Sequence, residues 1–269
     1  MPLSGFDLLH YASRMQPTAY PPVNALLESL LAQMQAILGN KLVGVYLYGS
    51  LVTGDFDPGI SDVDLLAATS SDIGEREFNS LKKMQDSIVL NHPEWADRLE
   101  VAYVSRHALR TFKTHTSQIA VISPGEPFHV KEAGRHYLIN WYVVREKGLT
   151  LLGPSPDTIV EPISKDEFIQ AVKEHVRAWR EWIHDAHSRP SQAYAILTLC
   201  RALYACTQGE QVSKRRAAVW AAKEWPEWSS TIENARAWRE AWREDVEDPD
   251  ATLPETRRFV NVVIDRVLS

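Results

Sequence analysis

Cysteine is nearly absent from this sequence: only Cys200 and Cys206 occur among 269 residues. They lie six positions apart in a segment with helical spacing, which separates them by roughly 9 Å of rise and points them to different sides of the helix. The two therefore cannot form a disulfide with each other. We expect two small buried hydrophobic side chains without a redox role.

Long apolar runs and a surplus of positive charge are also missing. No stretch approaches the ~18 apolar residues of a membrane span, and the start of the chain lacks the basic and apolar parts of a signal peptide. The net charge of −6 argues against general nucleic-acid binding, which needs a broad basic face. We expect a cytoplasmic protein, a monomer or weak dimer, that binds neither membranes nor nucleic acids.

The first half of the chain has the pattern of a small α/β domain. Apolar residues at helical spacing predict a helix over 22–38, and a polar helix follows over 75–90. Runs rich in β-branched and aromatic residues predict strands, which cover 42–48, 63–68 and 99–104. The order helix, strand, turn, strand, helix, strand predicts a small mixed sheet with helices packed on it.

From about residue 133 onward the apolar spacing is helical almost everywhere. The predicted helices cover 133–147, 165–187, 191–208, 213–224, 228–245 and 254–268. The segment 114–127 has no clear period, and we assign no role to 113–132. The chain is therefore expected to be an α+β protein, with an α/β domain over 1–130 and a helical bundle over 131–269.

One short segment carries the chemistry. Gly49-Ser50 ends the first strand, and Asp62-Val63-Asp64 follows after eleven intervening residues. Residues two apart in a strand share a face, so the two aspartates present adjacent carboxylates, and these need a cation between them. Mg²⁺ prefers a few carboxylates together with phosphate oxygens and water. The glycine lets the backbone approach a phosphate, and the serine hydroxyl can donate to it.

Glu100 lies in the third predicted strand, where alternation places it on one face with Ala102 and Val104. A carboxylate among small apolar side chains requires a reason. Either it ligates the same metal ion, or it accepts a proton as a general base, a task that partial burial assists by raising its pKa.

The segments 47–50, 61–66 and 99–101 together resemble the signature of the nucleotidyltransferase superfamily. They are similar in particular to the aminoglycoside adenylyltransferases of the streptomycin/spectinomycin type. The helical half is similar to that family's C-terminal domain in the segments 145–146, 151–154, 197–201 and 217–221, and at Gly209 and Lys214. The resemblance covers about residues 40 to 245.

The resemblance implies a role for each candidate residue. Asp62 and Asp64 would bind Mg²⁺, and Glu100 would be the catalytic base. The nucleotide would be bound by Gly49, Ser50, Arg201, Lys214 and Trp238, and the acceptor by Trp182 and Asp185. The implied reaction, in a cleft between the domains, transfers AMP from ATP to a hydroxyl of a small molecule, expected to be an aminoglycoside-type antibiotic, and releases pyrophosphate.

The roles of several residues in the helical half have alternatives. Arg201 interrupts an apolar run and could instead form a structural ion pair with Glu224 or Asp185. Trp182 and Trp238 could be core residues. Arg215 and Arg216, which follow Lys214, are expected on a solvated face.

The acceptor is the least constrained part of the hypothesis. Where the family carries carboxylates that hold the drug, this chain has His187 and Ser191. Two rival functions remain: nucleotide transfer to a protein hydroxyl, and a nucleotide-binding regulator without turnover. The intact set of Asp62, Asp64 and Glu100 argues against the second.

Overall fold

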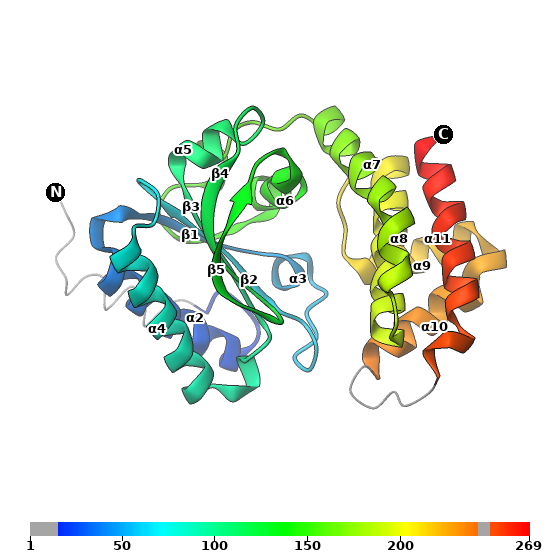
Figure 1. Cartoon of the computed structure of the whole chain (residues 1–269), viewed down its shortest axis with the longest axis horizontal. Helices are drawn as coiled ribbons and strands as arrows, with labels where there is room; N and C mark the ends of the chain where they lie inside the picture. Colours follow the sequence, from blue (N-terminus) through cyan, green and yellow to red (C-terminus); the bar gives the residue numbers. More distant parts are fainter. Residues whose placement is uncertain (1–15, 242–247) are drawn as a thin grey trace. The chain divides into compact units, whose positions relative to one another are not determined.

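The computed structural model describes residues 16–241 and 248–269, which divide into two compact units (Figure 1). Unit 1 extends to Val52 and resumes over Phe56–Pro162. Unit 2 comprises Ile163–Ser269 together with the short segment Thr53–Asp55.

Unit 1 is built on a six-stranded mixed sheet with the order β5-β4-β3-β2-β1-β6. The strands are β1 Leu42–Tyr48, β2 Val63–Thr69, β3 Leu99–Ser105, β4 Ser117–Ser123, β5 Glu126–Ala133 and β6 Leu149–Leu152. Strands β2 and β3 pair in parallel, whereas the other neighbours are antiparallel. The predicted mixed sheet and the three predicted strands are therefore confirmed.

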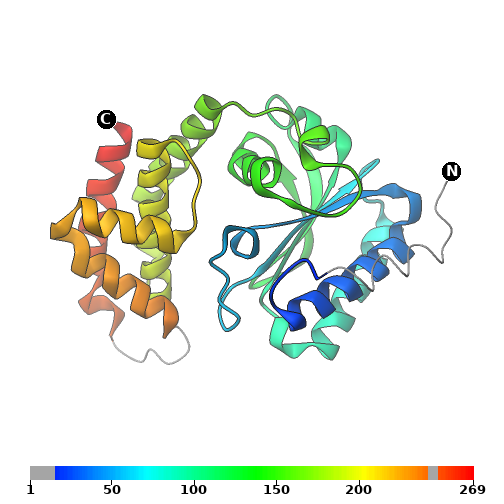
Figure 2. The ribbon, with the colours of Figure 1, turned by 180° about the vertical axis from the view of Figure 1, so that it is seen from behind.

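Two helices cover one face of this sheet. Helices α2 (Pro21–Leu38) and α4 (Glu75–Asn91) lie side by side in both views (Figures 1 and 2). Alternate strand residues such as Val45, Leu65 and Val101 are fully buried in the core beneath them. Helix α6 (Leu138–Lys147) packs against β1. Two short helices, α3 (Ser50–Thr53) and α5 (Arg106–Thr111), follow the ends of β1 and β3.

The segment that sequence periodicity could not place is a β-hairpin. Strands β4 and β5 pair across a turn at Gly125, whose φ of 75° suits glycine. Only two of the eight residues of β5 are buried, because it is the edge strand, so it lacks an apolar run that would have revealed it. The helix expected over 133–147 begins only at Leu138, after β5 and the short 3-10 helix Arg135–Tyr137.

The division between the units also differs from the expected one after residue 130. Strand β6 pairs with β1, and α6 packs on the same strand, so the segment 131–162 belongs to unit 1. The physical reason is that a four-residue strand such as β6 is too short to produce a periodic signal in the sequence.

Unit 2 is a bundle around one central helix. Its helices are α7 Lys165–Trp182, α8 Arg189–Gln208, α9 Lys214–Glu224, α10 Ser229–Glu240 and α11 Leu253–Leu268. Helix α8 packs against the other four and is buried over most of its length. The predicted helices are confirmed in position, although the one expected over 228–245 extends into residues outside the described ranges. Both Cys200 and Cys206 are free thiols.

Within the described ranges, no helix is long and apolar enough to cross a membrane.

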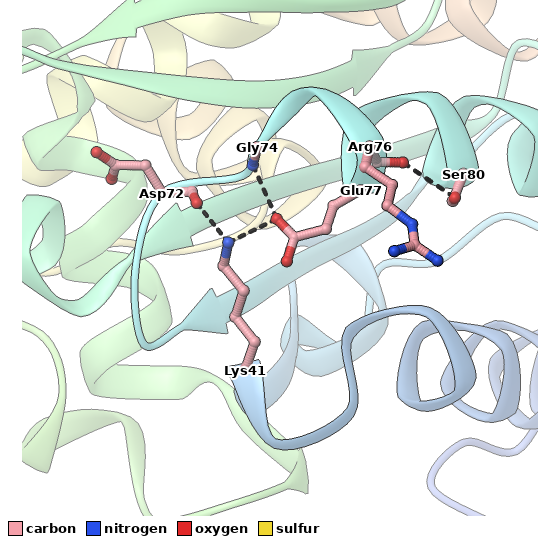
Figure 3. Close-up of polar contacts among 6 residues, drawn as sticks. All are labelled: Lys41, Asp72, Gly74, Arg76, Glu77 and Ser80. Carbon is pink, nitrogen blue, oxygen red and sulfur yellow. Dashed lines mark hydrogen bonds and ion pairs between the residues drawn. The ribbon is translucent and has the colours of Figure 1, made fainter.

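The start of α4 is held by a lysine that precedes β1 (Figure 3). The Lys41 ammonium donates to the Asp72 carbonyl and to Oε2 of Glu77, each at 2.5 Å. Glu77 also accepts the Gly74 backbone N–H at 2.8 Å, at the N-terminus of the helix. Burial alone would raise the pKa of Glu77, but these two donors lower it below its ordinary value.

We expect Lys41→Met to lower the free energy of unfolding by about 0.5–1 kcal/mol at neutral pH, the magnitude of a well-formed surface ion pair. The depressed pKa means that the contact stabilises the fold while Glu77 is ionised. The difference from wild type should therefore vanish as the pH falls through the pKa of Glu77. Urea denaturation at several pH values measures this difference in the free energy of unfolding. The control is Lys83→Met, which changes an exposed lysine on α4. A difference that persists in acid would contradict this account.

Candidate active site

A row of polar side chains crosses three neighbouring strands at one end of the sheet of unit 1. Tyr48 of β1 pairs with Asp64 of β2, and Asp64 pairs with Glu100 of β3. Directly paired residues place their side chains on the same face of a sheet. Asp62 lies two residues before Asp64, so the three predicted acids are brought together.

The Gly-Ser turn lies directly against one of these acids. Gly49 has a φ of 73°, and a Cβ atom at this position would overlap the Asp64 carboxylate. Only glycine satisfies both the backbone conformation and the close approach. Ser50 begins α3 immediately afterwards. The Gly49 backbone and the Asp64 carboxylate are thus adjacent.

The backbone on both sides of Asp62 is fixed by a buried arginine. Arg98, which is 7% exposed, donates from Nε and Nη2 to the Ser61 carbonyl at 3.1 and 2.6 Å. The Val63 N–H donates to the Arg98 carbonyl at 2.8 Å. The backbone position of Asp62 is therefore set by contacts on either side of it.

Glu100 has an environment suited to accepting a proton. Burial raises its pKa, whereas the Tyr48 hydroxyl, which donates to Oε1 at 3.2 Å, lowers it. The nearby charge of Asp62 raises the pKa further, and that of Lys131 lowers it. The net effect is a pKa above the ordinary value for glutamate. Such a carboxylate is a better base in the pH range of most enzymes.

Sequence reasoning missed the residues around Glu100. Asn140 of α6 forms a hydrogen bond with the Tyr48 side chain, and Lys131 of β5 forms one with Tyr137. Lys131 lies in the segment to which no role was assigned. Tyr48 stands next to the motif, but its contact with Glu100 depends on strand register, for which the sequence carries no visible signal.

In unit 2, an aromatic cluster is formed by the predicted residue Trp182 together with His175, Trp179 and Tyr194. The Lys214 ammonium lies 3.9 Å from the centroid of the Tyr194 ring. Trp182 is 47% exposed, so it is a surface residue of the cluster and not a core residue. Burial, and then the charge of Arg201, lower the pKa of His175. Arg201, Lys214 and Trp182 therefore lie around the same rings.

The other predicted residues of unit 2 have different surroundings. Asp185 is exposed at the end of the 3-10 helix Ile183–Asp185, which follows α7 directly. Trp238 of α10 is half-buried, and the Arg189 guanidinium lies 5.4 Å from its ring centroid. Ser191 belongs to the capping box of α8, whose N-cap is Ser188: the Ser191 hydroxyl accepts the Ser188 N–H at 3.1 Å and donates to the Ser188 carbonyl at 2.7 Å.

The N-terminus of α9 already has an acidic partner. Asp55, which is 8% exposed, accepts the Arg215 backbone N–H at 3.1 Å and its Nε–H at 2.9 Å. Ser213 accepts the Arg216 N–H at 3.1 Å. The Lys214 side chain, and not these amides, is therefore the candidate phosphate ligand. The expectation that Arg215 and Arg216 lie on a solvated face is confirmed, because both side chains are more than half exposed. Each also has an acidic partner, Asp55 for Arg215 and Glu210 for Arg216.

A magnesium ion would have to share its ligands with a substrate. Among residues 16–241 and 248–269, no group of three or more His, Cys, Asp and Glu side chains is arranged to hold a metal. Mg²⁺ commonly takes one or two carboxylates and completes its shell with phosphate oxygens and water. Asp62 and Asp64, with Asp64 against the Gly49 backbone, fit this arrangement.

Comparisons with known proteins match both units. Residues 27–116 match the model of the nucleotidyltransferase domain, and residues 158–266 match that of the aminoglycoside adenylyltransferase C-terminal domain. An aminoglycoside (3'') (9) adenylyltransferase of Klebsiella pneumoniae is 24% identical over 234 residues, which cover 79% of this chain and 83% of that protein. The protein of the same name from Escherichia coli is equally similar, with 82% of its length covered.

The fold has a solved counterpart. A crystal structure of the spectinomycin adenyltransferase AAD(9) from Enterococcus faecialis, with ATP and spectinomycin, matches with a TM-score of 0.71 at 18% sequence identity. The match covers 89% of this chain and 98% of that one. Because the two domain models occur in succession and together span most of the chain, the protein belongs to the aminoglycoside adenylyltransferases, enzymes of the nucleotidyltransferase superfamily.

Proposed function

We propose that this enzyme transfers AMP from ATP to a hydroxyl of an aminoglycoside-type antibiotic, with Mg²⁺, and releases pyrophosphate. The observation that carries the proposal is the placement of Asp62, Asp64 and Glu100 beside the Gly49-Ser50 turn. The names of the relatives, and the ATP and spectinomycin in the similar structure, support this choice of donor and acceptor.

Asp62 and Asp64 are proposed to hold the magnesium ion. When bound there, Mg²⁺ supplies positive charge to the phosphate oxygens, where negative charge develops during transfer. The Gly49 backbone and the Ser50 hydroxyl are proposed to bind phosphate oxygens beside these carboxylates.

The chemistry is an in-line displacement. The acceptor hydroxyl oxygen forms a bond to the α-phosphorus of ATP, and the bond from that phosphorus to the β-phosphate oxygen breaks. The hydroxyl proton passes to Glu100, and pyrophosphate leaves with the electron pair. Arg201 and Lys214 are proposed to bind the triphosphate and to stabilise the charge on the leaving group.

Trp182 and Asp185 are proposed to bind the acceptor. The exposed indole of Trp182 offers a flat apolar surface for a sugar ring, and the exposed Asp185 carboxylate offers a partner for an ammonium group. The Ser191 hydroxyl is engaged in the capping box of α8, so it is not proposed as a substitute for the family's carboxylates. Trp238 is proposed to lie near the nucleotide base.

We expect the wild-type enzyme to release pyrophosphate when it receives ATP, Mg²⁺ and an aminoglycoside, and the antibiotic to gain the mass of one AMP. Asp62→Asn or Asp64→Asn should abolish this turnover, because a single remaining carboxylate holds the ion poorly. Asp72→Asn, which changes an exposed carboxylate outside the motif, should retain it. Coupled pyrophosphate assays and mass spectrometry over a panel of aminoglycosides check the result. Normal rates in either motif variant would refute the metal assignment.

Glu100→Gln keeps the shape of the side chain and removes its basicity. We expect the turnover rate to fall roughly 10²- to 10⁴-fold, as when a general base is lost, with nearly unchanged Mg·ATP affinity. Calorimetry of ATP binding, beside single-turnover rates, distinguishes the two roles considered for Glu100. If ATP binding disappeared together with turnover, Glu100 would be a metal ligand.

We expect Arg201→Ala or Lys214→Ala to weaken Mg·ATP binding by about one to two powers of ten, the loss of a charge-assisted hydrogen bond. Lys223→Ala, an exposed lysine on the same helix as Lys214, is the matched control and should bind ATP as wild type does. Arg215→Ala should act instead on stability, because it leaves the buried Asp55 without its guanidinium partner. Dissociation constants from calorimetry, with thermal melts, test this set. Equal affinities in all variants would exclude Arg201 and Lys214 from the triphosphate site.

A further inference from the structure

Tyr48 has a position that the proposed chemistry has not yet used. It is the last residue of β1, it is 5% exposed, and its ring extends past its pairing partner Asp64 to the next strand. There its hydroxyl donates to Oε1 of Glu100 at 3.2 Å. A tyrosine on the strand before the catalytic turn thus contacts the proposed base two strands away.

The hydrogen bond between Tyr48 and Glu100 has a definite direction. An ionised carboxylate only accepts, so the proton of this bond belongs to the Tyr48 hydroxyl. The Asn140 side chain is a second polar neighbour of the same hydroxyl. Burial, and the charges of Glu100 and Asp64, raise the pKa of Tyr48 well above its ordinary value. The hydroxyl consequently remains a donor at neutral pH.

The two oxygens of Glu100 are not equivalent in this arrangement. Oε1 accepts from Tyr48, and it can accept whether Glu100 is ionised or carries a proton on Oε2. A hydroxyl proton arriving from the acceptor is therefore best placed on Oε2. A carboxylate that is held at one oxygen also loses little rotational freedom when it accepts a proton at the other.

We propose that Tyr48, oriented by Asn140, is a positioning residue that holds Oε1 of Glu100 and leaves Oε2 to accept the substrate proton. This inference rests on the proposed function, in which Glu100 is the base. Tyr48 acts through Glu100 and exchanges no proton with the substrate. Lys131, whose charge lowers the pKa of Glu100, also interacts with the Tyr137 side chain.

The chain supplies a matched control on the same strand. Tyr46 lies two residues before Tyr48, on the same face, and is fully buried. Its hydroxyl also makes a hydrogen bond, to the Pro154 carbonyl at 2.8 Å. Tyr46→Phe and Tyr48→Phe thus remove equivalent groups from equivalent surroundings, and only the second of these hydroxyls contacts Glu100.

The kinetic test compares these two variants. Tyr48→Phe should lower kcat by about tenfold to a hundredfold, the scale of one hydrogen bond to a charged group, with the KM for ATP within about twofold of wild type. Asn140→Ala should lower kcat in the same direction by a smaller factor. Tyr46→Phe should leave kcat unchanged. Equal kcat values for Tyr48→Phe and Tyr46→Phe would overturn the positioning role, as would a loss confined to KM.

A second measurement is independent of turnover. Unfolding of wild type, Tyr48→Phe, Glu100→Leu and the double variant gives the coupling between the two side chains, and we expect the two effects on stability to be clearly non-additive. Additive effects would refute the contact itself. If the coupling is present but no aminoglycoside is adenylylated by the wild type, the contact stands and the proposed function fails.

Discussion

The parallel pairing of β2 with β3 is the constraint on which the candidate site depends. It places Asp64 opposite Glu100, while the antiparallel pairing of β2 with β1 places Asp64 opposite Tyr48. A shift of one residue in either register would send one of these side chains to the other face, into the core beneath α2 and α4. The buried residues Val45, Leu65 and Val101 prevent such a shift, because they occupy that core. Packing on one face therefore sets the chemistry on the other.

Much of this arrangement could be predicted from the sequence. The strands at 42–48, 63–68 and 99–104 are short, apolar and bounded by turn residues, so their pattern is unambiguous. The central helix α8 was equally clear, because it is apolar on most sides. Elements that lie at an edge were not: β5 has only two buried residues and β6 has four residues in all, so neither leaves a periodic trace.

The site was predictable in its acids and not in their surroundings. Asp62, Asp64 and Glu100 follow from spacing along single strands. The contacts of Glu100 with Tyr48, and of Tyr48 with Asn140, join segments that are far apart in the sequence, and only strand register brings them together. The contact between Asp55 and the first turn of α9 is a similar case, since Asp55 precedes its partner Arg215 by 160 positions. Long-range polar contacts of this kind have no local signature.

The segment Thr53–Asp55 has a consequence for how this protein could be divided or recombined. It lies between the Gly49-Ser50 turn and the strand that carries Asp64, yet it belongs to the helical unit. The polypeptide therefore passes from one unit to the other more than once. A cut or a splice after Pro162 would leave the buried Asp55 carboxylate without Arg215 and the first turn of α9 without one of its acceptors. The two halves are consequently not interchangeable modules, and a helical domain borrowed from a relative would need a matching three-residue insert in the catalytic half.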